Sequence, residues 1–459
     1  GPLDCRNKHP DHMPTTLLTA DQVLTLDPQD HDYRPGYVLI EDDRIASTGP
    51  LAAAPEASYD RHVDLGARLL MPGFVNAHTH SPMVLFRGLV EGHSLFSLDG
   101  WYNTIRVVEE VMQPDMLPPA VTVSCAEMIR TGTTTFADQY FWMDRIVPAV
   151  RESGLRAALA YGIVELGDPQ ARERELAAAG SFLESLQGDP LLTAWLGPHA
   201  FFVDNRPEAM LRELALVREY GTGFHIHLGT SGEEDRICRE QYGCSAIEQL
   251  ERMGILSERI LAAHCLTLPE ADLPLLAERP FTAVVAVSSA MRNAGGAAPL
   301  KAMLAAGVNL ALGTDNVANN NSYDVFKEMQ ITGKLWSLLE RTPNAIPTRK
   351  IVEMATLGGA RALGLEDEIG SLEPGKQADL ISLDLEEIGW APRSGQDVYT
   401  ALVYSVTGMH VRDVMVAGRW LYRDGDWTTI DYAQARAELE ETRKRLQAIL
   451  NAQATEMLA

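Results

Sequence analysis

Cysteines are scarce in this 459-residue chain, basic residues are outnumbered, and long apolar runs are missing. The five cysteines (Cys5, Cys125, Cys238, Cys244 and Cys265) are odd in number and have no CxxC spacing, so they indicate neither a disulfide framework nor a thiolate zinc site. No charged segment leads into an apolar stretch near the start of the chain, as a secretory signal would require. We therefore expect a protein of a reducing compartment, the cytoplasm.

The charge balance narrows the range of partners. The chain has 39 basic and 63 acidic residues, a formal net charge of −24, which would repel a polyanion over most of the surface. With 46% hydrophobic residues it can bury a large core, yet it lacks the run of about 18 apolar residues that crosses a bilayer. We expect a small-molecule substrate, with no nucleic acid and no membrane as partner.

Short apolar runs that end in polar residues alternate with helical stretches through the middle of the chain. The predicted strands lie at 132–138, 194–199, 223–227, 260–264 and 308–315, and a helix with one apolar face is predicted at 207–220. Alternating strands and helices predict parallel strands, and the length suits a (β/α)₈ barrel of about 250 to 300 residues with a small second domain. Polar residues at the carboxyl ends of such strands are expected to carry the chemistry.

The two ends of the chain predict a smaller β domain. Strand patterns at 17–26 and 37–47 flank a turn at Asp42-Asp43, and a second strand-turn-strand signal covers 411–416 and 419–422. We predict that the two ends share one sheet. The expected organisation is an extension outside the fold at 1–12, a β-sandwich from 13–69 plus 366–430, the barrel at 70–365, and a C-terminal helix packed on the barrel at 431–459.

One motif places two histidines side by side. Met71 to His80 reads MPGFVNAHTH, and because side chains in a strand repeat every two residues, His78 and His80 point to the same side. Two imidazoles on one side can bind the same ion. The pair alone is weak evidence of a metal site, whereas the preceding Pro-Gly-Phe-Val-Asn-Ala strengthens it.

The sequence resembles the amidohydrolase superfamily, within it the branch of triazine hydrolases, chlorohydrolases and adenosine-type deaminases. The resemblance runs from about Met13 to Trp420. Its motifs occur in the family's order: PGFVNAHTH, GPHA at 197–200, HIHL at 225–228, AHC at 263–265, GTDN at 313–316 and GSLEPGKQADL at 370–380.

The resemblance implies one divalent metal ion held by four side chains. His78 and His80 would end the first barrel strand, His227 the fifth and Asp315 the eighth. Three imidazoles and a carboxylate suit zinc, which we expect, as well as iron, cobalt or manganese. Asp315 would also be the general base, because a carboxylate beside the attacking water can accept its proton and return it to the leaving group.

The resemblance assigns further residues to the pocket. His264, at the end of the sixth strand, would hold the attacking water or polarise the substrate. His199 in GPHA, Gln139 after another strand, and Trp101 with Tyr102 in the long connection after the first strand are predicted to line the substrate pocket. His225 is left out of the predicted site. Members of this branch commonly form dimers, so we expect a homodimer.

The chain departs from the family at two positions. Where deaminases and chlorohydrolases carry a glutamate that protonates a ring nitrogen, this chain has Thr230, whose hydroxyl has no accessible ionised form near neutral pH. Where the related stretch after the seventh strand begins with histidine, this chain has Val285, which we expect to replace a polar contact to the substrate with an apolar one. Neither change touches the predicted metal ligands.

Three interpretations stay open. The first is displacement of an amino, halide or thioether group from a nitrogen heterocycle, with Glu233 or Glu234 replacing the lost glutamate. The second is hydrolysis of an amide, urea, carbamate or thiocarbamate carbonyl, which needs no ring protonation. The third is a metal-binding scaffold without catalysis, which the presence of His264 argues against.

Overall fold

A closed ring of eight parallel strands forms the centre of the molecule. The computed structural model describes residues 14–56 and 59–458, so the extension predicted at 1–12 lies outside the described residues. In the ring each strand pairs in parallel with the next along the chain, in the order β8 to β15. The strands are β8 (Phe74–Thr79), β9 (Thr133–Tyr140), β10 (Arg156–Ile163), β11 (Leu192–Pro198), β12 (Gly223–Leu228), β13 (Arg259–His264), β14 (Phe281–Val285) and β15 (Asn309–Leu312).

Side chains and backbone close the ring between the first and last strands. Asn76 Nδ2 on β8 donates to Thr314 Oγ1 at 2.8 Å, Thr314 N donates to Asn76 Oδ1 at 3.0 Å, and Asp315 N donates to the carbonyl of His78 at 2.9 Å. The predicted (β/α)₈ barrel is confirmed. Its last strand is shorter than expected, because β15 ends at Leu312 and Asp315 lies beyond it.

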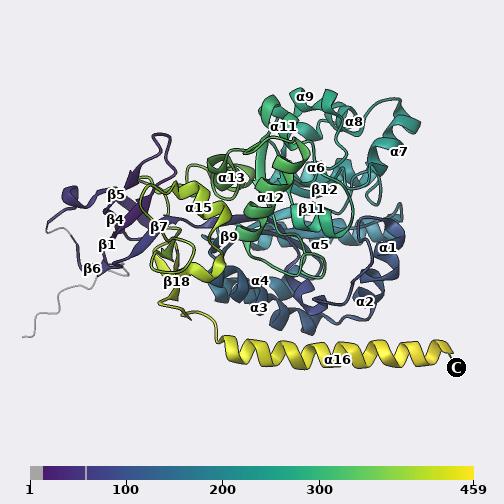
Figure 1. Cartoon of the computed structure of the whole chain (residues 1–459). Coiled ribbons are helices and arrows are strands. Elements are labelled where there is room, and N and C mark those ends of the chain that lie inside the picture. Colours follow the sequence, from purple (N-terminus) through teal and green to yellow (C-terminus); the bar gives the residue numbers. More distant parts are fainter. Residues whose placement is uncertain (1–13, 57–58, 459) are drawn as a thin grey trace, which may run out of the picture.

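Helices cover the outside of the ring (Figure 1). The helix predicted at 207–220 is α6, and Gly221 ends it in the left-handed conformation, which glycine adopts at little cost. Helices α1 and α2 lie in the long connection after β8. The helices are α1 (Leu98–Asn103), α2 (Ile105–Val111), α3 (Leu117–Arg130), α4 (Met143–Ser153), α5 (Pro169–Ser185), α6 (Pro207–Tyr220), α7 (Glu233–Tyr242), α8 (Ala246–Arg252), α9 (Leu273–Ala277), α10 (Val287–Arg292), α11 (Leu300–Ala306), α12 (Val325–Leu339), α13 (Thr348–Met354), α14 (Leu357–Leu363), α15 (Val398–Tyr404) and α16 (Tyr432–Leu458).

Two smaller sheets stand beside the barrel, on the left in Figure 1. One has the order β5-β4-β1-β6, and the other the order β19-β18-β17-β16-β7-β2-β3. The second sheet joins strands from both ends of the chain, as predicted, and side chains such as Leu18, Leu70 and Met415 pack together between the sheets. The strands are β1 (Thr16–Ala20), β2 (Gln22–Leu24), β3 (Asp32–Tyr33), β4 (Gly36–Glu41), β5 (Arg44–Pro50), β6 (Arg61–Asp64), β7 (Arg68–Pro72), β16 (Leu380–Asp384), β17 (Val411–Val416), β18 (Arg419–Arg423) and β19 (Asp426–Trp427).

A single residue separates the seven-stranded sheet, which contains β7, from the barrel. The last residue of β7, Pro72, pairs with Leu380, whereas Phe74, the first residue of β8, pairs with Thr133 in the barrel. A Cβ atom on the intervening Gly73 would lie 2.1 Å from the Thr134 side chain, so only glycine fits this joint. The domain boundary predicted between 69 and 70 falls inside β7.

A buried ion pair also links the two parts. Arg156 at the start of β10 donates from Nε to Asp379 Oδ2 at 2.8 Å and from its NH2 group to Asp379 Oδ1 at 3.1 Å. The same NH2 group donates to Gln377 Oε1 at 3.2 Å. Arg156 and Asp379 are both buried, so the pair is shielded from solvent and its loss would leave a charge without a partner.

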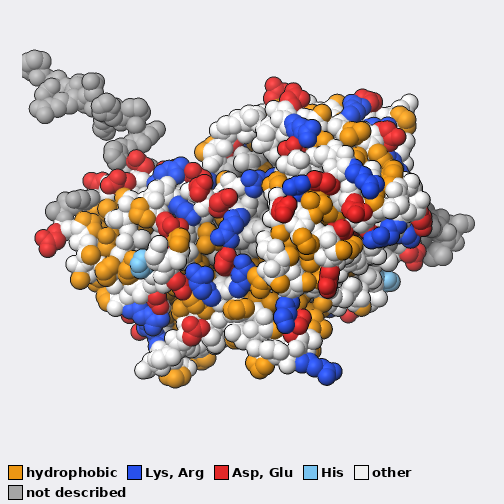
Figure 2. Space-filling model, turned by 90° about the horizontal axis from the view of Figure 1, so that it is seen from above, with side chains coloured by type: hydrophobic (Ala, Val, Ile, Leu, Met, Phe, Trp, Pro, Cys, Tyr) orange, Lys and Arg blue, Asp and Glu red, His pale blue; other side chains and the backbone are white. Residues whose placement is uncertain are grey.

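The C-terminal helix lies against the helices that surround the barrel. Helix α16 runs along the bottom of the view in Figure 1, packs on α3 and extends to Leu458, within the range 431–459 predicted for it. On the face shown in Figure 2, basic side chains are interspersed with acidic ones. Among the described helices, none combines the length and the apolar composition needed to cross a membrane.

Candidate metal centre and active site

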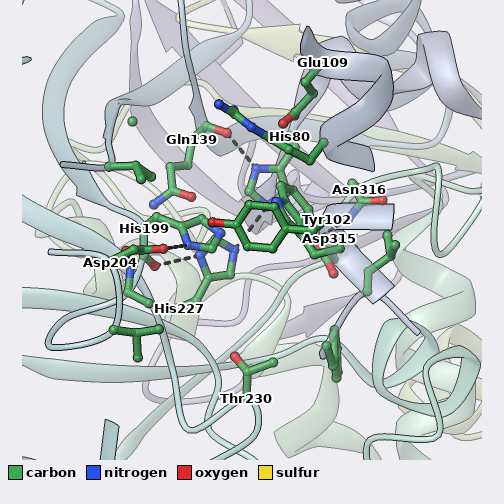
Figure 3. A pocket seen from close by; sticks show the side chains of 18 of the residues that line it. His80, Tyr102, Glu109, Gln139, His199, Asp204, His227, Thr230, Asp315 and Asn316 are labelled. Carbon is green, nitrogen blue, oxygen red and sulfur yellow. Dashed lines mark hydrogen bonds and ion pairs between the residues drawn. The ribbon is translucent and has the colours of Figure 1, made fainter. Parts of the chain in front are cut away.

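The four predicted metal ligands converge at the carboxyl end of the barrel. His78 is on β8, His80 directly follows it, His227 is on β12, and Asp315 follows β15. His78 Nε2 and His80 Nε2 lie 3.3 Å and 3.4 Å from Asp315 Oδ1, and His227 Nε2 lies 3.3 Å from His80 Nε2. Figure 3 shows His80, His227 and Asp315 pointing toward one another.

The hydrogen bonds of two histidines leave their inner nitrogens free for a metal. His80 Nδ1 faces the carbonyl of Gln139 at 2.6 Å, and His227 Nδ1 faces the carbonyl of His199 at 2.9 Å. Since a carbonyl only accepts, each Nδ1 carries the proton, and in the neutral imidazole Nε2 then bears a lone pair. Burial lowers the pKa of His227 well below its usual value, which keeps it neutral. Two lone pairs 3.3 Å apart beside a carboxylate suit a divalent cation.

Asp315 is held by neighbours on both oxygens. Asn316 Nδ2 donates to Oδ1 at 3.2 Å, and the Ser289 hydroxyl donates to Oδ2. Burial alone would favour the neutral acid, yet the neighbouring imidazoles of His78 and His80 hold the pKa of Asp315 well below its usual value. The residue has a φ of 60°, a left-handed conformation that turns its side chain back over the end of the barrel.

His264 lies beside Asp315 on its second oxygen. It ends β13 with a φ of 79°, and its Nε2 lies 3.9 Å from Asp315 Oδ2. Its Nδ1 is buried without a hydrogen-bond partner, and burial lowers the pKa of the imidazole to about 3. A neutral imidazole near the carboxylate can donate or accept a hydrogen bond with a substrate or water.

A cavity of about 280 Å³ opens above the four ligands. Its lining includes the predicted pocket residues Trp101, Gln139 and His199, and also Tyr102. Val285 is buried at the end of β14 and is not part of the lining, so the substitution there does not supply the apolar contact that the sequence suggested. A cavity of this size fits a small heterocycle.

His199 forms a charged pair on one wall of the cavity. Its Nδ1 lies 2.6 Å from Asp204 Oδ2, visible as a dashed line in Figure 3. Burial disfavours the cationic imidazole, but Asp204 overcomes that effect and raises the pKa of His199 above its usual value. Asp204 therefore fixes the orientation of the His199 ring on the wall of the cavity.

The position of the missing glutamate faces the cavity. Thr230 lines it, together with Glu233 and Glu234 from the first turn of α7. Glu234 is buried, accepts a hydrogen bond from the backbone N–H of Gly229, and has its pKa raised by burial. Glu233 is partly exposed and lies 4.0 Å from Arg236. Of the two acids considered from the sequence, only Glu234 is buried at the site.

Sequence reasoning missed three supporting residues. His225, left out of the predicted site, has its Nε2 2.7 Å from His78 Nδ1. Ser289 contacts Asp315, and Glu109 on α2 lines the cavity and accepts a hydrogen bond from Tyr140 at 2.8 Å. The alternation HxH at 225–227 was a signal for the first, because it places both imidazoles on the same face of β12. Glu109 lies in a helix far from any motif and gave no signal.

Comparisons with known proteins agree with this geometry. A family model described as the amidohydrolase family matches residues 69–421. The chain is 37% identical to a 5'-deoxyadenosine deaminase of Methanosarcina barkeri, over 96% of this chain and 100% of that protein. It is 37% identical to a 5-methylthioadenosine/S-adenosylhomocysteine deaminase of Desulforudis audaxviator, over 90% and 95%. An adenosine deaminase structure from Xanthomonas campestris with bound zinc is 31% identical with a TM-score of 0.88, over 94% and 98%.

Proposed function

Because this chain belongs to the amidohydrolase family, we propose that it is a metal-dependent hydrolase that displaces the amino group of an adenosine-type heterocycle. The broader function predicted from the sequence, displacement of an amino, halide or thioether group on a nitrogen heterocycle, includes this reaction. The observation that carries the proposal is the convergence of the Nε2 atoms of His80 and His227, which lie 3.3 Å apart beside Asp315. The cavity above them has the size of a small heterocycle.

We propose that His78, His80, His227 and Asp315 hold one divalent ion, and that the ion is zinc. Zinc accepts imidazole and carboxylate ligands in this combination, and a zinc-bound relative has the same fold over most of its length. Iron, cobalt and manganese accept the same donors. A bound ion of this charge lowers the pKa of water toward about 7 and so makes an attacking group available at neutral pH.

The two oxygens of Asp315 have different contacts, which suit two different roles. Oδ1 faces His78 and His80, whereas Oδ2 is oriented by the Ser289 hydroxyl and lies near His264. We assign to this carboxylate the removal of a proton from the attacking water and its delivery to the departing amine. His264 holds the reacting oxygen in line, and His199, oriented by Asp204, forms part of the wall against which the substrate lies.

A second candidate is hydrolysis of an amide, urea, carbamate or thiocarbamate carbonyl. It is favoured by Thr230, because a carbonyl polarised directly by the ion needs no acid at that position. A non-catalytic metal scaffold is the third possibility. A scaffold that only binds a metal does not account for His264, whose Nε2 lies 3.9 Å from Asp315 Oδ2.

We also keep as proposals the division into a barrel and a β-sandwich domain, a homodimer, and a cytoplasmic location. Limited proteolysis tests the first, and sedimentation at several protein concentrations tests the second. Localisation of the tagged full-length chain in its host tests the third.

The decisive experiment is a substrate screen with protein of known metal content. The expected result is ammonia release from adenosine-type compounds, with one equivalent of metal per chain and loss of both in Asp315→Asn. Turnover confined to ureas and carbamates would favour the second candidate. Inactivity of the metal-loaded protein on both panels would leave the scaffold interpretation.

A further inference from the structure

Thr230 removes the proton source that a neutral ring needs. When water attacks the amino-bearing carbon of a neutral heterocycle, the electron pair moves onto a ring nitrogen, which must then accept a proton. At the end of β12, beside His227, the lining offers a threonine hydroxyl, which does not ionise near neutral pH. Glu234 is close along the chain, but its carboxylate is held by the backbone N–H of Gly229.

The lining of the cavity instead contains more acidic than basic side chains. Besides Asp315 and Asp204, four glutamates line it, against a single arginine, Arg106, which lies 3.5 Å from Glu110. Asp204 is paired with His199. The four glutamates are Glu109, Glu110, Glu233 and Glu234. Such a lining favours a cationic ligand and repels an anionic one.

One of these glutamates has an unsatisfied oxygen. Glu109 is 6% exposed, and its Oε1 accepts from Tyr140, whereas its Oε2 is buried without a hydrogen-bond partner. A buried carboxylate oxygen without a donor is costly, and a positively charged N–H or N-alkyl group in the cavity would relieve that cost. In Figure 3, Glu109 and Thr230 lie on opposite sides of the histidines, so Glu109 does not replace a side chain at the position of Thr230.

We propose that the preferred substrate is an amino-heterocycle that already carries a positive charge, such as an N-alkylated or strongly basic ring. This inference rests on the proposed hydrolytic deamination and names its substrate class. The charge on the ring takes the place of the missing acid, because the electron pair displaced by the attack neutralises the cation and needs no added proton. Threonine is also shorter than glutamate, which leaves room for an alkyl group on the ring nitrogen.

The reaction balances without another reactant. Water adds to the amidinium carbon, forming the C–O bond, and Asp315 takes one of its protons, so the adduct is neutral. Asp315 then returns that proton to the amino group, the C–N bond breaks, and the second proton of the water passes from the new hydroxyl through Asp315 to the departing ammonia as the carbonyl forms. The products are a neutral ring carbonyl and an ammonium ion, which carries away the positive charge of the substrate.

The test compares 5'-deoxyadenosine with its 1-methyl derivative, whose ring is cationic at pH 7, using the metal-loaded full chain. We expect kcat/KM for ammonia release to be at least about 100-fold higher for the methylated ring, since a general acid contributes roughly 10²–10⁴-fold to such a step. Thr230→Glu should reverse this preference by restoring an acid and obstructing the methyl group. Thr230→Gln, which has the size of the glutamate but no proton to give, should obstruct the methylated ring without activating the neutral one.

Binding provides a second readout. Glu109→Gln should weaken inhibition by a 1-methylated product analogue whose ring is positively charged. This loss of inhibition should be about tenfold greater than the loss seen with the analogue whose ring is neutral. Equal turnover of both rings by the unmodified chain would overturn the inference and leave the deaminase proposal intact. Selective loss of neutral-ring turnover in Glu234→Gln would assign the proton to Glu234 and also overturn it. Turnover of neither ring would instead remove the proposed deamination on which the inference rests.

Discussion

His78 Nδ1 lies 2.7 Å from His225 Nε2, in the interior of the barrel. Only one of these two nitrogens can carry the proton between them. If His78 donates it, its own Nε2, which is buried without a hydrogen-bond partner, presents a lone pair toward Asp315 at 3.3 Å. In that arrangement His225 accepts the hydrogen bond from His78 and orients its ring, so that Nε2 of His78 faces the proposed metal position.

Replacing His225 should weaken metal binding. His225→Ala removes the acceptor for His78 Nδ1, and loss of such an orienting partner costs about 10- to 100-fold in metal affinity. Competition with a chelator of known affinity measures this directly. His93→Ala, a change at an exposed loop histidine, is the matched control and should have no effect. Unchanged affinity in His225→Ala would mean that His78 needs no partner.

Replacing a predicted metal ligand should lower metal content and activity more than replacing His225, which only orients a ligand. His80→Ala deletes one of the two Nε2 atoms that converge beside Asp315, so the metal content should fall below one equivalent per chain and kcat/KM should fall more than about 100-fold. Elemental analysis of the purified variant, next to an activity assay, checks both. A variant with full metal content would remove His80 from the ligand set.

Ser289 should affect turnover more than metal content. Its hydroxyl donates to Asp315 Oδ2, while Oδ1 faces the histidines, so Ser289→Ala disturbs the oxygen assigned to proton transfer and spares the other. We expect kcat to fall about 10- to 100-fold with metal content retained. Ser289→Thr keeps the hydroxyl and should recover most of the rate. Equal rates in all three proteins would show that Asp315 needs no such orientation.

The strand pattern predicted the barrel and the shared terminal sheet, because both depend on local periodicity and on chain order. The resemblance to the amidohydrolase superfamily, carried by its motifs, implied all of the proposed ligands. The contacts of Glu109 and Ser289 could not be predicted in this way. Glu109 reaches the cavity only through the packing of α2 against the end of β9, and Ser289 in α10 meets Asp315, 26 residues later in the chain, only through the tertiary structure. Val285 shows the converse, since alignment placed it at the substrate and packing placed it in the core.

Glu328 should make stability depend on pH. Burial raises its pKa from 4.5 to about 7, although Ser288 N and Asn320 Nδ2 donate to it. Between these two values Glu328 binds more protons in the folded chain than in the unfolded chain, so its contribution to stability, about 3 kcal/mol, is fully present below pH 4.5 and is lost as pH rises through 7. Urea unfolding at pH 5 and pH 8 should show this loss, and Glu328→Gln should lack it. The same difference in both proteins would contradict the assignment.

The ion pair between barrel and sandwich should be worth more than pairs on the surface. Arg156→Ala leaves Asp379 buried and unpaired, which should cost about 3–5 kcal/mol of unfolding free energy. Arg174→Ala removes an exposed arginine that lies 3.3 Å from Glu175, and should cost less than about 1 kcal/mol. Chemical denaturation of the two variants checks the difference. Equal losses would mean that solvent reaches the inner pair.

The joint at Gly73 ties the chemistry to the alignment of two sheets. Pro72 is fixed opposite Leu380 and Phe74 opposite Thr133, so no slack exists between the strand pairing of one domain and that of the other. Side chains alternate along β8, and inserting or deleting one residue here would turn both histidines outward, away from Asp315. The shape of the cavity can therefore change through single substitutions, whereas an insertion or deletion at Gly73 would displace the histidines and abolish the site.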